Sequence, residues 1–343
     1  MINSISKIIF VISLILGRVI TISSSSWLGI WIGLEINLLS FIPLIIDNKN
    51  ILYSESAIKY FLIQTIASLI FLFSSIFYII KFNFYFNLEK LGYENFIITR
   101  AIIIKLGAAP LHFWFPNIIE GLSWNNTLIM LTWQKIAPLI ILSIIHLNNF
   151  FNFFIIISSL VGSIGGINQI SLKKILTYSS INHISWILLA NIINDILWSF
   201  YLIIYLLINY SLIKIFEIYN LTNINQLFIF KSNFPIIKFC FLVNILSLGG
   251  LPPFLGFFPK WMIAENLILN NRLFILFVLI ISTLITLYFY ARVTFSAFLF
   301  SYPNFSWNKF FINNDSLITK NLIINFFIIA SFTIFCLNTF FVI

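Results

Sequence analysis

Four ionisable side chains of this sequence stand inside long apolar stretches. They are Glu35, Lys105, Lys135 and Lys260. If these stretches cross a membrane, a charge at the centre costs about 2.5 to 3.5 kcal/mol and is retained mainly where it is paired or hydrated. Each of the four is therefore a candidate for chemistry inside a membrane, and the reaction that such groups share is the uptake and release of protons.

A carboxyl group and lysines in one apolar interior can form a proton switch. Apolar surroundings disfavour the charged form of either group, whereas an opposite charge nearby favours it. Movement of Glu35 toward or away from a lysine would therefore change whether that lysine holds its proton. Successive lysines joined by water and polar side chains would extend this switch into a relay near the membrane midplane.

Two histidines, His112 and His183, could connect the lysines in such a relay. Polar residues also precede His183 along the chain: Tyr178, Ser179, Ser180 and Asn182. The alternative for the histidines is an ordinary buried position with satisfied hydrogen bonds. For a lone lysine, the alternative is a side chain that extends toward the membrane surface, and this applies most to Lys260.

The elements that must position these residues are membrane-spanning helices. Of the 343 residues, 61% are hydrophobic and only 8% are charged, and the mean hydropathy is +1.05. These charges are too few to coat a water-soluble protein, so the outer solvent must be lipid. At about 20 apolar residues per crossing, the length accommodates roughly ten to twelve helices. The sequence predicts an all-α integral membrane protein with a single domain over residues 1–343.

Apolar runs separated by Asn, Ser and Asp divide the chain into about eleven predicted transmembrane helices. They cover residues 2–22, 25–46, 57–81, 96–113, 124–143, 150–170, 174–191, 195–219, 237–267, 272–300 and 320–342. The first run is interpreted as a retained helix, because no small-residue cleavage site follows it. More basic residues fall on the N-terminal side of the membrane, which predicts that the N-terminus faces the cytoplasm or the mitochondrial matrix.

Gly and Pro interrupt two of these runs, near residues 98–121 and 237–267. Aligned without a gap, Gly107 to Pro116 and Gly250 to Pro259 share the Gly, a Pro three residues later, a penultimate Phe and the final Pro. The alternative is coincidence, since these residues are common in membrane helices. Discontinuous helices of transporters have such interruptions, because unwound backbone must face a polar cavity. The copies are the fourth and ninth predicted helices, an odd number of five helices apart, so they would run in opposite directions, as an inverted repeat requires.

Other features of the sequence carry little chemistry. The net charge of +9 comes from scattered basic residues that form no stripe, so no nucleic-acid partner is predicted. Cys240 and Cys336 share no metal or redox spacing and are interpreted as inert core residues. Neither a metal nor a haem is expected, because the three histidines are dispersed.

Six strings of this sequence resemble one known family. They are Trp27-Leu-Gly-x-Trp-x-Gly-Leu-Glu-Ile-Asn-Leu-Leu-Ser-Phe-Ile-Pro43, Lys105-x-Gly-Ala-Ala-Pro-x-His-Phe-Trp-Phe-Pro116, Thr132-Trp-Gln-Lys-Ile-Ala-Pro138, Gly165-Gly-x-Asn-Gln169, Ser179-Ser-Ile-Asn-His183 and Leu246-Ser-Leu-Gly-Gly-Leu-Pro-Pro-Phe-x-Gly-Phe-x-Pro-Lys260. Over nearly its whole length, the chain is similar to antiporter-like membrane subunits of mitochondrial NADH:ubiquinone oxidoreductase (respiratory complex I), in their short animal form.

This resemblance implies a fold of two inverted five-helix repeats and a place in the membrane arm of the complex, in the mitochondrial inner membrane. It assigns Glu35 as the family's glutamate, Lys105 as its partner, Lys135 as the connecting lysine and Lys260 as the exit-side lysine. The partners it implies are the other membrane-arm subunits and lipids, with protons as the only substrate. No cofactor is expected in this chain, because FMN, iron-sulfur clusters and ubiquinone belong to other subunits.

The chain departs from the family in its three methionines, its abundance of Ile and an arginine, Arg18, in the first predicted helix. We hypothesise that a mitochondrial gene was read with the standard genetic code, which would turn Met codons into Ile and a Ser codon into Arg. The abundance of Phe, Ile, Asn, Lys and Tyr fits an AT-rich genome such as an insect mitochondrial one.

Two other functional classes share these features. One is a structural subunit that holds its neighbours together, with static lysines. The other is a free-standing cation/proton antiporter, which would have the same fold.

Overall fold

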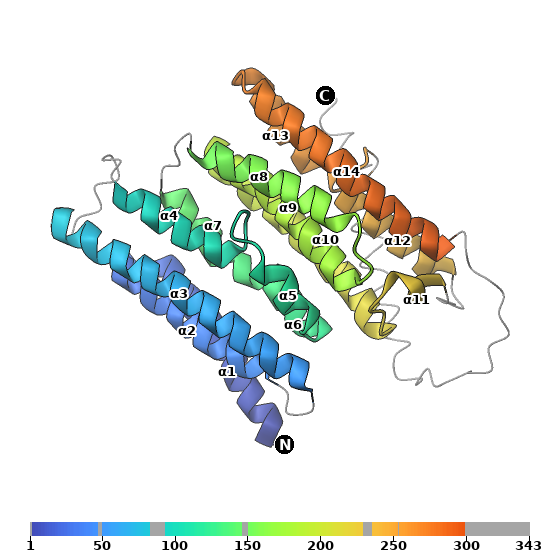
Figure 1. The fold of residues 1–343 in the computed structure, drawn as a ribbon. Coiled ribbons are helices and arrows are strands. Elements are labelled where there is room, and N and C mark those ends of the chain that lie inside the picture. Colours follow the sequence, from blue (N-terminus) through green and yellow to red (C-terminus); the bar gives the residue numbers. More distant parts are fainter. Residues whose placement is uncertain are drawn as a thin grey trace. The chain divides into compact units, whose positions relative to one another are not determined.

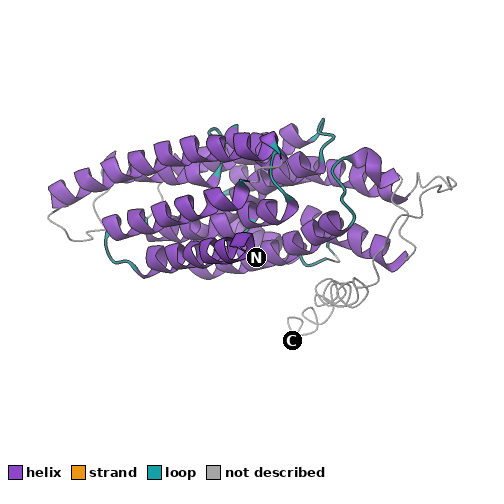
Figure 2. Cartoon of the chain, turned by 90° about the horizontal axis from the view of Figure 1, so that it is seen from below, coloured by secondary structure: helices purple, strands orange, loops and turns teal. Residues whose placement is uncertain are grey.

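The computed structural model describes residues 2–46, 50–82, 93–145, 150–228, 235–252 and 254–298. Within these ranges the chain forms helices joined by short loops, as Figures 1 and 2 show. The helices are α1 (Ile2–Ser23), α2 (Trp27–Ile45), α3 (Ile51–Phe82), α4 (Tyr93–Leu106), α5 (Trp114–Glu120), α6 (Trp124–Leu131), α7 (Trp133–Ile144), α8 (Phe150–Gly166), α9 (Leu172–Ile193), α10 (Asp195–Ile218), α11 (Ile224–Phe228), α12 (Pro235–Gly249), α13 (Phe257–Leu269) and α14 (Leu273–Phe298).

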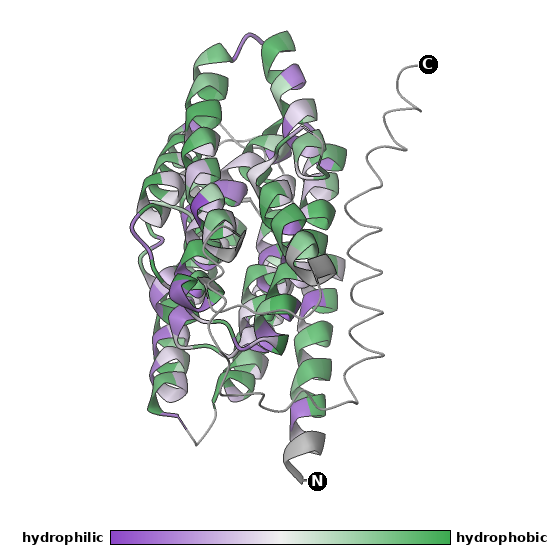
Figure 3. Cartoon of the chain, turned by 90° about the vertical axis from the view of Figure 1, so that its right-hand side faces the viewer, coloured by the Kyte–Doolittle hydropathy of each residue, from purple (hydrophilic) through white to green (hydrophobic). Residues whose placement is uncertain are grey.

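Six stretches of the described residues are long and apolar enough to cross a membrane. They are Ser6–Ser23, Trp27–Ile45, Ile51–Ile80, Trp124–Ile144, Asp195–Ile218 and Leu273–Ser296. Large apolar side chains are exposed along them, such as Leu69 at 62% and Leu284 at 62%, and apolar residues predominate along the helices in Figure 3. Lipid is the solvent that stabilises such a surface. The predicted all-α membrane class is confirmed, whereas the predicted helix 320–342 lies outside the described residues and the count of eleven stays a prediction.

The chain divides into two compact units, residues 1–158 and 159–343, and the division falls within α8. In the first unit, α2 packs against α1 and α3, and α4 packs against α3 and α7. In the second unit, α9 packs against α10, α13 and α14, and α12 packs against α10 and α14.

Glycines bring the backbones of α1 and α2 close together. A Cβ atom on Gly33 would lie 2.8 Å from the carbonyl oxygen of Gly17, and a Cβ on Gly17 would lie 2.9 Å from the amide nitrogen of Asn37. Both distances are too short for a real side chain. Small residues allow such close packing of membrane helices, and here they fix the helix that carries Glu35.

Helix α9 is enclosed by its unit. Every residue from Ser179 to Asn191 is buried, although this stretch includes His183 and several hydroxyl and amide side chains. Many of its hydroxyl groups donate to backbone carbonyls one turn earlier, as Ser180 does to Thr177 at 2.7 Å. These bonds satisfy polar side chains that lipid could not.

Both interrupted helices end with the same backbone geometry. Gly107 after α4 has φ 72° and Gly250 after α12 has φ 80°, a region that glycine enters without a steric penalty. The amides of Gly107 and Ala108 bond to the carbonyl of Ile103, and those of Gly250 and Leu251 bond to the carbonyl of Leu246. Each helix therefore ends at a glycine, in the manner of a Schellman cap.

Local backbone chemistry explains where the helices differ from the predicted ranges. The predicted helix 96–113 ends at Leu106, because Gly107 leaves the helical region. The predicted helix 124–143 is divided at Thr132, which has φ −114° and ψ −74° and whose hydroxyl donates to the carbonyl of Leu128. A threonine hydroxyl competes with the backbone in this way. Helix α3 begins at Ile51 and not at residue 57, and α11 was not predicted.

Candidate functional site

Lys105 and Lys135 line one enclosed cavity in the first unit. Lys105 lies in the last turn of α4, before the interruption, and Lys135 lies in the first turn of α7, just after Thr132. Their exposed fractions are 8% and 3%. The cavity between them has a volume of about 20 Å³. Since one water needs about 10 to 15 Å³ of such space and polar partners, the cavity can hold a single water.

Polar side chains from three helices complete this cavity. Asn37 comes from α2, Tyr60 and Gln64 come from α3, and Gln134 precedes Lys135 on α7. These side chains provide donors and acceptors that could orient a water molecule between the two ammonium groups.

An amide pair joins α2 to α7 beside the cavity. Asn37 donates from Nδ2 to Oε1 of Gln134 at 2.6 Å, and Gln134 donates from Nε2 to Oδ1 of Asn37 at 3.5 Å. Asn37 lies two residues after Glu35, and Gln134 lies directly before Lys135. The pair therefore fixes the backbones that carry two of the predicted site residues.

Glu35 lies on α2 and is partly buried, and its Oε2 atom has no hydrogen-bond partner among the described residues. The carboxylate interacts electrostatically with the Lys105 ammonium. The two groups nevertheless form no ion pair within 4.0 Å. A carboxylate held near a lysine, without direct contact, fits the separated position of a two-position switch.

Arg18 on α1 is buried beside these groups, with an exposed fraction of 2%. Its Nη2 donates to Oε1 of Gln134 at 2.8 Å, and its guanidinium lies 5.9 Å from the ring centroid of Trp133. Its Nε and Nη1 atoms are buried and have no partner in the described part of the chain. A buried, incompletely bonded guanidinium is unfavourable, so this position is poorly suited to arginine.

His112 lies in the turn between α4 and α5, with an exposed fraction of 5%. Its Nδ1 atom is 3.2 Å from the carbonyl oxygen of Pro110, and its ring lies 4.3 Å from that of Phe113. After the interruption, the ring centroid of Phe115 in α5 lies 5.7 Å from Nζ of Lys135. The interruption thus places an aromatic ring beside one of the buried lysines.

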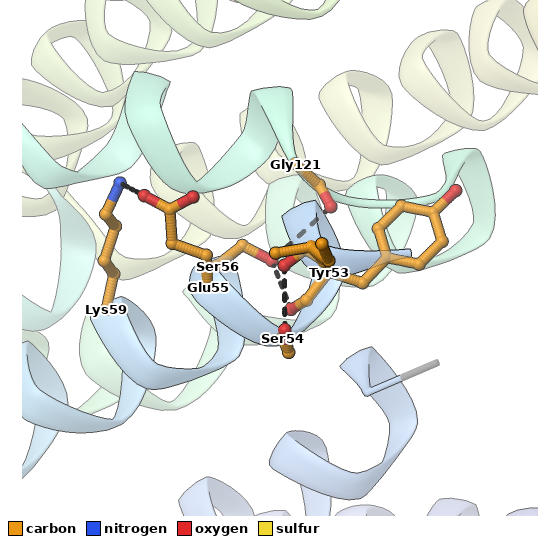
Figure 4. Close-up of polar contacts among 7 residues, drawn as sticks. Tyr53, Ser54, Glu55, Ser56, Lys59 and Gly121 are labelled. Carbon is orange, nitrogen blue, oxygen red and sulfur yellow. Dashed lines mark hydrogen bonds and ion pairs between the residues drawn. The ribbon is translucent and has the colours of Figure 1, made fainter. Parts of the chain in front are cut away.

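The start of α3 carries an exposed ion pair, in contrast to the buried lysines. Figure 4 shows Lys59 paired with Glu55 at 2.6 Å, with side chains 48% and 55% exposed. In the same view, Ser56 donates to the carbonyl of Gly121 at 3.4 Å, a contact that holds the end of α5 against α3. An exposed pair of this kind contributes about 0 to 1 kcal/mol, so Lys59 is a suitable control for the buried lysines.

Lys260 of the second unit reaches back across the second interruption. It lies in the first turn of α13, and its Nζ atom donates to the carbonyls of Gly249 at 3.0 Å and Leu248 at 3.4 Å. These carbonyls end α12, and the C-terminal end of a helix carries partial negative charge that favours a cation. With an exposed fraction of 8%, Lys260 is buried at a helix end and does not extend to the membrane surface.

His183 on α9 has two tyrosine neighbours from α10. Its Nδ1 atom forms a hydrogen bond of 2.8 Å with the hydroxyl of Tyr201, and its ring lies 5.1 Å from that of Tyr205. The histidine is buried, with an exposed fraction of 6%. The hydrogen bond fixes the orientation of the buried imidazole.

The predicted site residues fall into two groups. The first unit contains Glu35, Lys105, Lys135 and His112, and it brings the two lysines to one cavity. The second unit contains Lys260 and His183. Their roles in proton transfer stay predictions.

Sequence reasoning missed Asn37, Gln134, Tyr60 and Tyr201. Asn37 and Gln134 stand within the strings that carry the family resemblance, beside charged residues, and this proximity was a usable signal. Tyr60 and Tyr201 lie in long apolar helices that show no signal of this kind.

These features define a class: a transporter-like membrane bundle with two interrupted helices and buried lysines beside the interruptions. Residues 24–286 match the family described as NADH:quinone oxidoreductase/Mrp antiporter, TM. NADH-ubiquinone oxidoreductase chain 2 of Anopheles gambiae is 49% identical over 94% of this chain and 95% of its own length, and that of Bos taurus is 36% identical over 88% of each. The chain belongs to this family, and its relatives within it are chain 2 of NADH-ubiquinone oxidoreductase.

Solved structures share the fold. A chain of respiratory complex I from Thermus thermophilus with bound aureothin has a TM-score of 0.85 at 22% identity, covering 95% of this chain and 77% of that one. A chain of the Mrp complex from Dietzia sp. DQ12-45-1b has a TM-score of 0.75 at 17% identity, covering 84% and 60%. The antiporter-like architecture is therefore shared well beyond close relatives.

Proposed function

We propose that this chain translocates protons as a core membrane-arm subunit of mitochondrial NADH:ubiquinone oxidoreductase. Its relatives are named as chain 2 of that enzyme. Quinone reduction in other subunits would drive the movement, and no redox step would occur in this chain. FMN, iron-sulfur clusters and ubiquinone would be bound elsewhere in the complex.

The cavity shared by Lys105 and Lys135 is the observation that carries this proposal. Two buried lysines line one water-sized space, and two protonated lysines there would repel each other, so a proton on one would disfavour a proton on the other. A water in that space would give the proton a path between them. When one lysine gains a proton, the other would therefore lose its own proton.

Glu35 would act as the switch for this pair. Movement of its carboxylate toward Lys105 stabilises the protonated lysine, and movement away destabilises it. The fixed backbone of α2 limits this movement to the side chain, since Asn37 is bonded to Gln134 and Gly33 packs on Gly17.

Lys260 and His183 would continue the relay in the second unit. The carbonyls of Leu248 and Gly249 stabilise a charged Lys260, and Tyr201 offers His183 a hydroxyl for proton exchange. The matching caps at Gly107 and Gly250 support an inverted repeat that would relate the two interrupted helices. The N-terminus would face the matrix, and the partners would be other membrane-arm subunits and the lipids of the inner membrane.

Proton pumping by variants of the assembled complex tests the proposal. We expect K105M and E35Q to lower the number of protons moved per NADH oxidised by at least a third, with normal assembly on native gels. K59Q removes an exposed, paired lysine and should leave this number unchanged. The measurement is proton uptake by sealed inner-membrane vesicles alongside NADH oxidation.

Two results would favour the other classes. An unchanged proton-to-electron ratio in both K105M and E35Q would contradict the proposal and favour a structural subunit with static lysines. Exchange of sodium or potassium for protons by the purified chain alone would instead favour a free-standing antiporter.

A further inference from the structure

A second cavity lies away from the buried lysines, at the end of α14. It is a cleft of about 460 Å³ between that helix, the loop before α9 and the start of α11, all in the second unit. Its wall includes Ile170, Ile224, Arg292 and Phe295. The proton relay proposed above uses none of these residues.

Backbone hydrogen bonds hold the floor of the cleft in place. The amide of Ile224 donates to the carbonyl of Ile170 at 3.0 Å, and the amide of Leu172 donates to the carbonyl of Thr222 at 2.9 Å. The bridge between Ser171 and Asn223 lies between these bonds. Two loops distant in the sequence thus form one fixed surface, and the cleft is preformed.

Arg292 places a positive charge in this cleft without an anion to match it. Its Nη2 donates to the carbonyl of Gln169 at 2.8 Å, which anchors the guanidinium against the loop. Its Nε is buried and has no partner in the described residues, and no described carboxylate lies within 4.0 Å of it. A partly buried guanidinium with an unused donor offers a binding position for an anionic group from outside these residues.

Most of the remaining surface of the cleft is apolar and exposed, although Gln169, Asn225 and Ser296 also line it. Ile170, Tyr288 and Phe295 are exposed by 61%, 61% and 55%. Arg292 lies within the last turns of the apolar stretch Leu273–Ser296, where a span meets the membrane surface. A fitting ligand therefore has an anionic group at the level of the membrane surface and an apolar part extending along α14.

We propose that this cleft binds a membrane phospholipid, with its phosphodiester group at Arg292. The guanidinium would donate to phosphate oxygens, as arginine commonly does. An acyl chain would lie against Tyr288 and Phe295. Lys173 and Lys174 follow the cleft in sequence and add positive charge that attracts anionic headgroups. The site would stabilise the end of α14 independently of proton transfer.

Photolabelling of the assembled complex tests this site. The probe is phosphatidylglycerol with a diazirine on one acyl chain, and labelled peptides are mapped by mass spectrometry. We expect labelling of peptides that contain Ile170 or Phe295, and at least a fivefold loss in R292Q. R272Q is the matched control at the opposite end of α14 and should label normally. F295N should also lose label, whereas F274N, at the other end of the helix, should not.

Two competitions keep the proposal testable if R292Q does not assemble. Excess unlabelled phosphatidylglycerol should compete for the wild-type site, and diacylglycerol of the same chain length should not. Equal competition by diacylglycerol would overturn the role of the phosphate.

Discussion

The two interrupted helices use the same cap but place their lysines on opposite sides of it. In the first unit, Lys105 precedes Gly107 and faces a cavity, with no hydrogen-bond partner among the described residues. In the second unit, Lys260 follows Gly250 and donates to the carbonyls that end α12. One lysine is thus left available to a water, and the other is held by the helix end itself.

This difference shows how one backbone motif supports two chemical environments. A lysine before the cap lies on the helix and is free to exchange hydrogen-bond partners. A lysine after the cap returns to the helix end, where the partial negative charge favours its protonated form. The position of Lys260, unlike that of Lys105, therefore depends directly on the geometry of the interruption.

The largest expected effect comes from placing a side chain at the second cap. A Cβ on Gly250 would lie 2.9 Å from Nζ of Lys260, whereas one on Gly107 would meet Phe115 at 3.2 Å. The left-handed backbone costs a non-glycine residue about 1 to 2 kcal/mol at either position. G250A should also displace Lys260 and break the hydrogen bonds of its ammonium group. The total loss in stability of the subunit is then about 3 kcal/mol.

The neighbouring glycine provides the control for this comparison. A Cβ on Gly249 would have no neighbour closer than 3.6 Å, so G249A should be nearly neutral. The measurement is the fraction of subunit that stays in the complex after a graded heat step, read on native gels. Equal losses in G250A and G249A would contradict the dependence of Lys260 on the cap.

Removal of the lysines should separate the two environments. K260M leaves the carbonyls of Leu248 and Gly249 without their donor, and it should destabilise the subunit by about 1 to 3 kcal/mol. K105M removes an ammonium that has no hydrogen bond among the described residues but interacts with Glu35, so it should destabilise the subunit less than K260M does. The same heat assay checks both variants, and the reverse order of stability would contradict this account of the lysines.

The histidines extend the comparison with a smaller effect. His183 is held by the side chain of Tyr201, whereas the hydrogen-bonding contact of His112 among the described residues is with a backbone carbonyl, that of Pro110. Y201F should cost about 1 kcal/mol, the typical value of one hydrogen bond. Y210F changes an exposed tyrosine on the same helix, α10, and should have no effect. The heat assay compares the stability of Y201F with that of its control variant. Equal stability of the two variants would contradict a contribution from the hydrogen bond between His183 and Tyr201.

The smallest effect is expected at Arg18. Two of its guanidinium nitrogens are buried without partners, so R18S should leave stability unchanged or slightly improved. Peptide mass spectrometry of the native protein tests the genetic-code hypothesis directly, and we expect serine at position 18 and methionine at many of the Ile positions. Detection of Arg18 and those Ile residues in the native chain would refute it.

Particular residues show which parts of the fold and site were predictable. Gly107 and Gly250 were visible as interruptions, because glycine and proline act on the backbone locally. The division of the helix at Thr132 was not predictable from the sequence, since it depends on whether one hydroxyl bonds to a carbonyl four residues earlier. Charges in apolar runs identified the four principal candidates. Tyr60, which lines the lysine cavity, and Tyr201, which bonds to His183, come from other helices, and single-sequence periodicity carries no information about which helices become adjacent.

The close contact of Gly17 with Gly33 has a consequence for the rate of switching. Because α1 and α2 touch through their backbones, α2 cannot rotate or slide without carrying α1 with it. Shifts of whole helices take microseconds to milliseconds, whereas rotations of exposed side chains take picoseconds to nanoseconds. In the proposed switch, the partly buried carboxylate of Glu35 would therefore move by rotation about its own bonds, without a joint shift of α1 and α2.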